Sequence, residues 1–262
     1  MIEVKNLGFA YNSRTVLRDI SININDGEVV GIIGPNGAGK TTLIRLITGL
    51  LRPGSGRIII KSDSSTFDPK DVSRRFLARY ISVLPQNPSV LEDYTVEDIV
   101  VMGRYARSGG ISYTRDDYEI AEMALKEIDI LPIKDRFISQ LSGGEIKMTL
   151  IARTIAQNTP ILIFDEPTAD LDLAHRERIM EFITEKCRKE NRSLLIVMHD
   201  ITLSARYLNR LILIAEEKII SDGLPRDVIT EANILKAYHI DTEITWYKGA
   251  PFINPLITKE VM

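Results

Sequence analysis

The sequence of 262 residues predicts an α/β fold built on a mainly parallel sheet, and two observations lead to this prediction. Short apolar runs without strict alternation recur along the chain, and buried parallel strands have that pattern. Amphipathic helical stretches separate these runs, the clearest from Leu173 to Glu190, with Asp172 placed to cap its start and Asn191 to end it. The apolar runs are "EVVGIIG" at 28–34, "ILIFDE" at 161–166, "SLLIVMH" at 193–199 and "RLILIA" at 210–215.

The two ends of the chain have a different pattern. Residues 2–11 ("IEVKNLGFAY") and 16–28 ("VLRDISININDGE") predict an N-terminal antiparallel β layer, with a turn at 25–27. The stretch "KSDSSTFDPKDVSRR" at 61–75 is expected to be an exposed loop that leads into a helix. Near the C-terminus, "TWYKGAPFIN" at 245–254 predicts an edge hairpin or a dimer contact.

Helical patterns interrupt the alternation of strands and helices between about Tyr94 and Gln157. The segment "TVEDIVVM" begins this block, and Thr95 with Asp98 predicts a capping box at its start. The sequence therefore predicts a single domain over residues 1–262, with a helical subdomain at 94–157 inserted within it.

Composition is that of an ordinary globular protein. Hydrophobic residues make up 44% and charged residues 26% of the chain, and the net charge of −3 does not favour a nucleic-acid partner. The single cysteine, Cys187, excludes an internal disulfide and fits a reducing compartment. The start of the chain lacks a signal-peptide pattern, and the apolar runs fall short of the roughly 18 residues that a membrane helix needs. We therefore expect a cytosolic protein that does not cross a bilayer by itself.

A phosphate-binding loop is predicted directly after the first apolar run. Gly34, Gly39, Lys40 and Thr41 match G-x-x-x-x-G-K-[ST] between a strand and a helix. Without side chains in the way, the backbone N–H groups can converge on a phosphate, which the positive end of the following helix also attracts. Lys40 is expected to reach the terminal phosphates, Thr41 to ligate Mg²⁺, and Thr42 to contact the phosphate nearer the ribose. The remaining loop members are Pro35, Asn36, Gly37 and Ala38. The alternative is a glycine-rich turn that binds nothing.

Two further constellations bear chemistry. Asp165 and Glu166 end a buried strand, where one carboxylate can hold the Mg²⁺ shell and the other can polarise the attacking water. Adjacent buried carboxylates are costly unless a cation compensates them. A second phosphate-binding surface is offered by the helix start at Ser142, Gly143 and Gly144. One triphosphate does not need two such surfaces in one chain, but two chains that face each other could each present this segment to the phosphate loop of the other. Taken alone, this segment is more simply an ordinary serine-capped helix start.

In this order, these motifs resemble the ATP-binding cassette (ABC) family, and the resemblance covers nearly the whole chain. Residues 34–42 look like its Walker A segment, and 161–166 look like its Walker B segment, with Glu166 as the catalytic carboxylate. "LSGGE" at 141–145 is similar to the signature "LSGGQ", and Thr168–Asp172 matches the D-loop. The fold implied is a P-loop NTPase core, and the cofactors implied are ATP and Mg²⁺.

Three single residues receive roles only through this resemblance. Gln86 in "VLPQNP" matches the Q-loop glutamine, which implies a Mg²⁺ contact and a link to a membrane partner. His199 matches the switch histidine that contacts the γ-phosphate, and Tyr11 matches the aromatic that stacks on adenine. Considered separately, Tyr11 would be a half-buried strand residue, Gln86 a loop amide, and His199 a satisfied histidine at a strand end.

A finer resemblance is to the ATPases of iron–siderophore, haem and cobalamin importers. It rests on "TVEDIVVMGRYAR", "DRFISQLSGGE" and "GLPRDVITEANILKAYHIDTEI". It implies a homodimer on the inner face of the cell membrane, beneath a permease. A substrate-binding protein delivers the cargo to that permease. The docking groove is expected around Gln86 and the helix from Thr95 to Arg104, because the apolar "IVVM" adjoins a nucleotide ligand.

The chain departs from the family pattern at two places. Glu145 replaces the commoner glutamine of the signature; at a helix start a carboxylate favours the helix, but it would repel a nucleotide presented by a partner chain. "IKMTL" replaces the usual basic "RQRV", so that only Lys147 keeps a charge in this part of the signature helix.

The predicted function is ATP hydrolysis that energises import of a metal chelate. Two chains close on two ATP molecules, Glu166 directs water at the γ-phosphate, and hydrolysis reopens the pair. The alternative is a soluble cassette ATPase acting as a conformational clamp in cofactor assembly or repair, but the chain shows neither a basic nucleic-acid face nor a second cassette. A simple nucleotide kinase leaves "LSGGE" and His199 unexplained.

Overall fold

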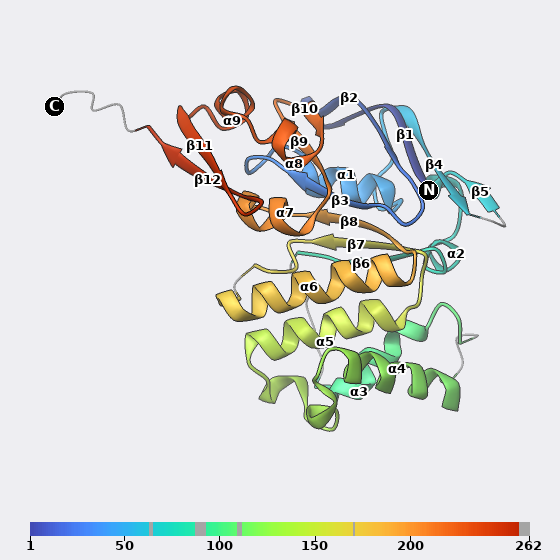
Figure 1. The fold of residues 1–262 in the computed structure, drawn as a ribbon. Coiled ribbons are helices and arrows are strands. Elements are labelled where there is room, and N and C mark those ends of the chain that lie inside the picture. The colour runs from blue at the N-terminus through green and yellow to red at the C-terminus, as the bar shows by residue number, and fades with distance from the viewer. Residues whose placement is uncertain (63–64, 87–92, 109–111, 170, 257–262) are drawn as a thin grey trace. The chain divides into compact units, whose positions relative to one another are not determined.

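The computed structural model describes residues 1–62, 65–86, 93–108, 112–169 and 171–256 (Figure 1). These residues form two compact units. The first consists of Met1–Lys70 with Leu195–Met262, and the second of Asp71–Leu194. The boundary between the units falls within strand β8, Ser193–Val197.

An antiparallel sheet begins the first unit. Strand β1, Ile2–Tyr11, pairs with β2, Arg14–Ile24, on one side and with β4, Ser55–Ser62, on the other. Leu17, Ile20, Ile22 and Ile24 of β2 are buried, so an apolar face holds the register. The predicted N-terminal antiparallel layer is therefore confirmed.

The expectation of a plain loop at 61–75 was wrong. Strand β5, Ser65–Phe67, pairs antiparallel with the end of β4, so these residues extend the sheet before helix α2, Arg74–Leu77, begins. The polar, serine-rich sequence concealed the strand because β5 is short and has no fully buried side chain. The helix that follows was expected, and Ser73 caps it by accepting a hydrogen bond from the Phe76 N–H.

Parallel strands form the second layer of the first unit. Strand β3, Val29–Ile33, pairs parallel with β9, Arg210–Ala215, and β10, Lys218–Gly223, adds antiparallel to β9. All five residues of β3 are buried, as its apolar run predicts. The helices of this unit are α1 at Lys40–Ile47, α7 at Ile201–Tyr207, α8 at Pro225–Val228 and α9 at Glu231–Tyr238.

The C-terminal segment is a hairpin, as expected. Strand β11, Thr242–Tyr247, pairs with β12, Ala250–Pro255, and they form a separate two-stranded sheet instead of the edge of a larger one. Lys248 and Gly249 make the turn with φ of 47° and 82°, a left-handed pair that suits a tight hairpin. Its predicted role as a dimer contact stays a prediction.

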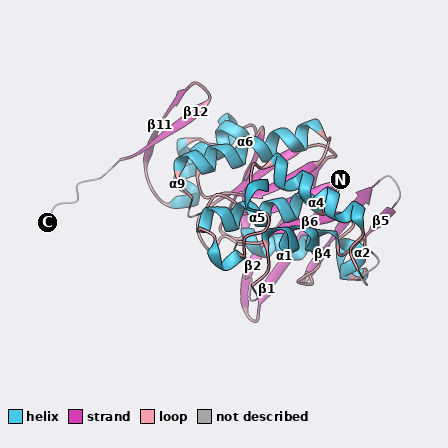
Figure 2. Cartoon of the chain, turned by 90° about the horizontal axis from the view of Figure 1, so that it is seen from below, coloured by secondary structure: helices cyan, strands magenta, loops and turns pink. Residues whose placement is uncertain are grey.

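The second unit places helices beside a parallel strand pair (Figures 1 and 2). Strand β6, Ile81–Leu84, pairs parallel with β7, Ile161–Asp165. Helices α3, α4 and α5 pack against one another. The helices are α3 at Val96–Val101, α4 at Arg115–Glu127, α5 at Gly143–Ala156 and α6 at Leu173–Lys189, with short 3₁₀ turns η2 at Met102–Arg104, η3 at Leu131–Ile133 and η4 at Ile138–Gln140.

The predicted helix caps are confirmed. Thr95 and Asp98 form a capping box at the start of α3, and Asp172 caps α6 by accepting from the His175 N–H. Asn191 follows α6 with φ of 52°. Cys187 is fully buried on the inner face of α6, and burial raises the pKa of its thiol to about 12, so it is an unreactive core residue.

The apolar side chains of α3 belong to the core. Ile99, Val100 and Val101 are each 2% exposed or less. The apolar side chains that motivated the expected docking groove are therefore core residues, because apolarity alone does not distinguish a buried helix face from an interaction surface. The groove around Gln86 and the helix from Thr95 to Arg104 stays a prediction. In residues 94–157 the described structure consists of helices, turns and one isolated bridge, Thr95–Phe137, while their status as an inserted subdomain of one 1–262 domain stays a prediction.

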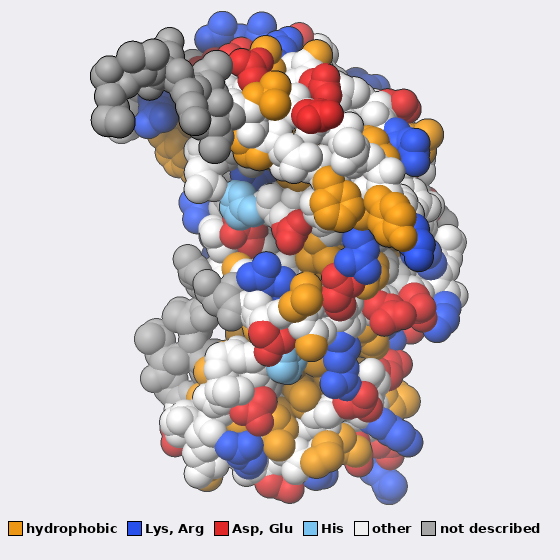
Figure 3. Space-filling view, turned by 60° about the vertical axis from the view of Figure 1, so that its left-hand side comes forward, with side chains coloured by type: hydrophobic (Ala, Val, Ile, Leu, Met, Phe, Trp, Pro, Cys, Tyr) orange, Lys and Arg blue, Asp and Glu red, His pale blue; other side chains and the backbone are white. Residues whose placement is uncertain are grey.

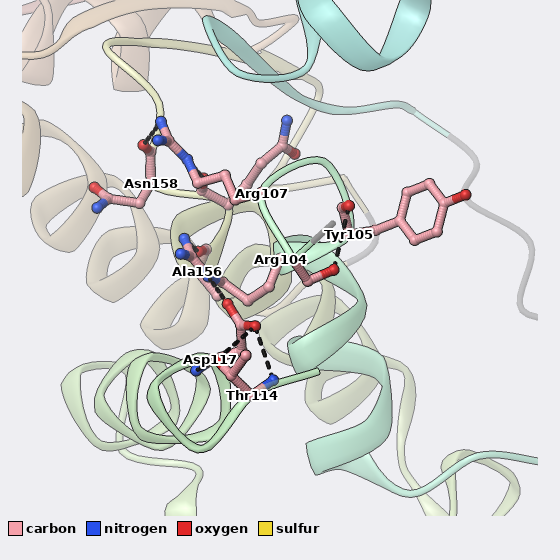
Figure 4. A network of polar contacts seen from close by, with 9 residues as sticks. Arg104, Tyr105, Arg107, Thr114, Asp117, Ala156 and Asn158 are labelled. Carbon is pink, nitrogen blue, oxygen red and sulfur yellow. Dashed lines mark hydrogen bonds and ion pairs between the residues drawn. The ribbon is translucent and has the colours of Figure 1, made fainter. Parts of the chain in front are cut away.

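A buried ion pair fastens α4 and α5 to the turn after α3 (Figure 4). The Arg104 Nε donates to Asp117 Oδ1 at 3.0 Å, and its Nη1 donates to the Ala156 carbonyl at 2.9 Å. Asp117 also accepts from Thr114 in the capping box of α4. These contacts fix the far end of α5, the helix whose first residues carry the signature segment.

Charged side chains of both signs cover the surface. On the face drawn in Figure 3, basic and acidic side chains lie interspersed among apolar ones. This distribution agrees with the small net charge of −3. No helix in the described part of the chain combines the length and apolarity needed to span a bilayer.

Candidate active site

The predicted phosphate loop connects β3 to α1, and packing requires glycine at its first position, Gly34, and at Gly39. Gly34 has φ of 148°, and a Cβ there would lie 2.0 Å from the Ile214 carbonyl oxygen. Gly39 has φ of 96°, and a Cβ there would lie 2.7 Å from Leu17 and 3.0 Å from the Val16 carbonyl. Any side chain at either position would displace the loop from the strands that hold it.

Lys40 lies over this loop at the start of α1. Its side chain is 5% exposed, and its Nζ donates to the Gly34 carbonyl at 2.8 Å and to the Pro35 carbonyl at 2.9 Å. Gly39 provides no side-chain cap, and the first turn of this fully described helix contains no acidic residue. The positive helix end and the ammonium are therefore directed at the loop without a carboxylate in that turn to neutralise them, which suits an anionic ligand.

The rest of the loop divides by exposure. Asn36 and Gly37 are exposed, and a Cβ at Gly37 would meet nothing within 4 Å. Ala38 is buried, and its N–H donates to the Pro35 carbonyl at 3.3 Å. Thr41 is half-buried and Thr42 is buried in the first turn of α1. The loop thus has a packed base and an open rim.

His199 lies at the same sheet edge as the loop. It is exposed and follows β8, just before Asp200, which caps α7. The neighbouring Met198 N–H donates to the Ile32 carbonyl of β3 at 3.0 Å, two residues before Gly34. The structure therefore brings His199 and the phosphate loop to adjacent strand ends within the first unit.

Tyr11 ends β1 and is 41% exposed, so it is not the half-buried strand residue that the simpler interpretation expected. Its ring contacts Phe9 edge-on, with the centroids 4.8 Å apart. Its strand neighbour Arg14 leads into Val16, whose carbonyl lies against Gly39. An exposed aromatic one strand away from the loop is suited to stacking on a base.

Sequence reasoning missed Tyr238 at the end of α9. Burial raises the pKa of its hydroxyl to about 12, and a hydrogen bond with the backbone of Gly34 acts in the opposite direction. The tyrosine therefore supports the first residue of the phosphate loop. No local pattern indicates this contact, because it joins residues more than 200 positions apart.

Asp165 and Glu166 occupy the end of β7 in the second unit. They are 2% and 9% exposed, and Glu166 adopts a left-handed backbone conformation with φ of 54°. The Gln86 side-chain amide donates to Glu166 Oε2 at 2.9 Å, and the Lys147 Nζ donates to the Glu166 carbonyl at 3.2 Å. Two polar groups from distant segments therefore hold the predicted catalytic residue, Gln86 at its carboxylate and Lys147 at its backbone carbonyl. The predicted contact of Gln86 with Mg²⁺ stays a prediction.

The signature segment is a closed capping box. Ser142 caps α5: its N–H and its hydroxyl both donate to Glu145 Oε2 at 2.8 Å, while the Glu145 N–H donates to the Ser142 Oγ at 3.3 Å. Arg136 donates to the other carboxylate oxygen at 3.2 Å. The Ser142 hydrogen bonds and then the Arg136 charge hold the pKa of Glu145 below its usual value. Gly143 is exposed and Gly144 is half-buried.

The D-loop and the Mg²⁺ donors are described in part. Position 170 lies outside the described residues, while the Ala169 N–H donates to the Glu166 carbonyl at 3.3 Å. The donors expected for Mg²⁺ are the buried Asp165 carboxylate and the Thr41 hydroxyl. Both are hard oxygen ligands, and Mg²⁺ is commonly bound by one or two such protein groups with phosphate and water oxygens. Each of the two side chains, taken by itself, therefore has the chemistry that the ion requires.

Comparison with known proteins decides the family. Residues 17–169 match the family model described as ABC transporter. The chain belongs to the ABC transporter family. This match spans the phosphate loop, Gln86, the signature segment and Glu166, and it confirms the resemblance predicted from the motifs.

Individual relatives and a solved structure agree with this assignment. The probable siderophore transport system ATP-binding protein YusV of Bacillus subtilis is 32% identical over 93% of this chain and 88% of its own length. The cobalamin import ATP-binding protein BtuD of Halobacterium salinarum is 34% identical over 90% of this chain, which spans 58% of that relative's length. A chain from an ABC transporter described as metal-chelate type, in an inward-facing conformation, superposes with a TM-score of 0.83 at 27% identity and covers 99% of both chains. The predicted α/β fold class is therefore confirmed.

Proposed function

We propose that this chain is the ATP-hydrolysing subunit of an importer that moves a metal chelate through a partner permease. The observation that carries the proposal is the loop from Gly34 to Gly39, with its open rim, its uncapped helix end and the buried ammonium of Lys40 above it. This arrangement is suited to the phosphates of a nucleoside triphosphate. The cargo class follows from relatives named for siderophore, haem and cobalamin import.

In this proposal the phosphate loop and the end of β7 contact different parts of the Mg²⁺–ATP complex. Backbone N–H groups of the loop bind the phosphates, Lys40 contacts the terminal ones, and Thr42 contacts the one nearer the ribose. Tyr11 stacks on the base. Thr41, Gln86 and Asp165 would hold Mg²⁺, which when bound would neutralise the charge that develops on the transferred phosphoryl group.

Glu166 and His199 complete the chemistry. The Glu166 carboxylate accepts a hydrogen bond from the attacking water and orients it toward the γ-phosphate, while His199 donates to a γ-phosphate oxygen. Gln86 keeps the carboxylate in place through its 2.9 Å hydrogen bond. Catalysis is mainly positioning and charge stabilisation, since phosphoryl transfer needs little covalent help.

The signature segment serves a second chain in this proposal. Ser142, Gly143, Gly144 and Glu145 of one chain approach the nucleotide on the loop of its partner, so that ATP holds a homodimer together. The permease docks against this dimer at the inner face of the cell membrane, and a substrate-binding protein delivers the cargo from the other side. No nucleic acid takes part.

Reconstitution tests the import function. A candidate permease is incorporated into proteoliposomes, with the chain and ATP on the side that corresponds to the cytoplasm. Uptake of a ferric siderophore, haem or cobalamin that requires ATP and is abolished by Glu166→Gln is expected. The conformational clamp would instead be supported if the chain hydrolyses ATP without a permease, if the permease does not increase the hydrolysis rate, and if no uptake occurs.

A further inference from the structure

Lys147 is a buried cation that the predicted mechanism does not use. It lies in the second turn of α5, five residues after Ser142, and it is 9% exposed. Lysine is rarely buried to this extent, because desolvation of an ammonium is costly unless polar groups compensate it. Its Nζ donates to the Glu166 carbonyl at 3.2 Å, which joins the signature helix to the end of β7.

Glu166 has a backbone conformation that needs support. A φ of 54° is left-handed and costs free energy for a residue other than glycine, so the surrounding structure must hold it. Lys147 binds the carbonyl of Glu166, and Gln86 binds its carboxylate at 2.9 Å. The residue is thus held at its backbone and at its side chain from two different segments.

The charge of Lys147 acts at the same place. Asp165 and Glu166 are adjacent carboxylates at a buried strand end, an arrangement that needs a nearby cation. The ammonium lies within hydrogen-bonding distance of the backbone of one of them. It therefore supplies positive charge beside the pair.

We infer that Lys147 is a positioning residue for hydrolysis: it holds the Glu166 backbone in the left-handed conformation from which the carboxylate meets the attacking water. The inference rests on the proposed function, since it requires Glu166 to act on that water. It deepens that function by giving a task to the only charged residue in 146–150.

Three substitutions separate the contributions of Lys147. Lys147→Met removes both the donor and the charge at similar length. Lys147→Gln keeps an amide donor, but its shorter side chain does not reach the Glu166 carbonyl. Lys147→Arg keeps a charged donor of sufficient length. The matched control is Thr154→Val on the same helix, because Thr154 is also buried and its hydroxyl donates to the Leu150 carbonyl of the same helix, at 2.8 Å.

The readout is the split between kcat and ATP affinity in the purified full-length chain. Lys147→Met is expected to lower kcat about ten- to a hundredfold, the range that misplacement of a reacting group produces, while the ATP Kd stays within about twofold. Lys147→Arg should restore most of the rate, and Thr154→Val should leave kcat unchanged even if its Tm falls. A rate equal to wild type in Lys147→Met, or an equal loss in Thr154→Val, overturns the inference.

Two controls keep the test decisive. If Lys147→Met does not fold, Lys147→Gln takes its place, and a wild-type kcat in that variant overturns the positioning role. Wild type and Glu166→Gln are measured in parallel. No hydrolysis by wild type, or full hydrolysis by Glu166→Gln, contradicts the proposed function itself, whereas normal behaviour of both with a fully active Lys147 variant contradicts the inference alone.

Discussion

The Gln86 side-chain amide donates a hydrogen bond of 2.9 Å to the Glu166 carboxylate, across 80 positions of the sequence. The bond joins the segment after β6 to the end of the neighbouring parallel strand β7. It places the residue expected to communicate with a membrane partner in direct contact with the residue expected to act on water. A shift of Gln86 therefore changes the position of the carboxylate without any intermediate residue.

Replacing Glu166 tests the chemistry. Glu166→Gln keeps the shape and the hydrogen-bonding partners of the side chain but loses its negative charge. ATP binding should persist and ATP-bound dimers should accumulate, while steady-state turnover falls by about 10²- to 10⁴-fold, the contribution typical of a general base. The control is Glu181→Gln, an exposed acid of α6. Turnover near wild type in purified Glu166→Gln would reject the assignment.

Tyr11 is expected to contribute to nucleotide affinity without selecting the base. Tyr11→Ala removes a stacking surface worth about 1–3 kcal/mol per base, so affinity should fall roughly tenfold for ATP and for GTP alike. Titration calorimetry measures both. Tyr247→Ala is the control, since Tyr247 is a more exposed tyrosine at 62%. Unchanged affinity in Tyr11→Ala would make this residue an ordinary strand-end side chain.

The buried pair of Arg104 and Asp117 should matter for stability. Burial acts to raise the pKa of Asp117, but hydrogen bonds from Thr114 and Arg104 outweigh it and hold the pKa below its usual value. Asp117→Asn leaves the Arg104 charge without its anionic partner in the core and should cost about 3–5 kcal/mol of unfolding free energy. Urea unfolding at neutral pH measures this loss.

The same pair predicts a pH dependence. The folded-state pKa of Asp117 is depressed. The contribution of its carboxylate to the free energy of unfolding is therefore complete above the unfolded-state pKa of about 3.9, and it disappears as the pH falls through the folded-state pKa. The difference in stability between wild type and Asp117→Asn should therefore shrink below about pH 4. A constant difference from pH 7 down to pH 3 would contradict the assigned ionisation.

A pair of heterodimers tests the shared nucleotide site. In the first, one chain carries Lys40→Ala and the other Ser142→Arg, so that one composite site has both lesions and the other has none. In the second, one chain carries both lesions and its mate none, so that each composite site has one lesion. If Lys40 and Ser142 act on the same ATP from opposite chains, only the first heterodimer should retain a nucleotide.

Retained nucleotide per dimer is the appropriate measurement, because hydrolysis requires further residues. Differently tagged chains are purified through both tags, incubated with ATP and separated from free nucleotide. Retention by the second heterodimer but not the first would show that each chain uses its own loop and signature. That result would also remove the reason for a second phosphate-binding surface at 142–145.

Local patterns predicted much of this fold and of its loop. The phosphate loop, the antiparallel layer and the caps at Thr95, Ser142 and Asp172 depend on residues close in sequence, and their chemistry determines the conformation. The strand at 65–67 escaped prediction because its pairing with β4, and not its composition, defines it. The contacts of Lys147 and Gln86 with Glu166 join distant segments, and no local pattern encodes them.

The apolar run at 99–102 shows a different difficulty. Its residues match a buried helix face and a docking surface equally well, and only the position of α4 and α5 against α3 decides between them. Ile99 and Val100 prove to be core residues. Apolarity next to a predicted ligand does not by itself indicate a docking surface, because the sequence does not show what covers the helix.

Helix α5 carries Ser142 at its first turn and Lys147 about 7–8 Å further along its axis, at 1.5 Å per residue. Arg104 fastens the far end of this helix through the Ala156 carbonyl. In the proposed dimer, a partner's nucleotide that contacts Ser142 would act on the same helix that carries Lys147 and its hydrogen bond to the Glu166 carbonyl. Nucleotide binding in one half of that dimer and hydrolysis in the other half would then be coupled through a single helix.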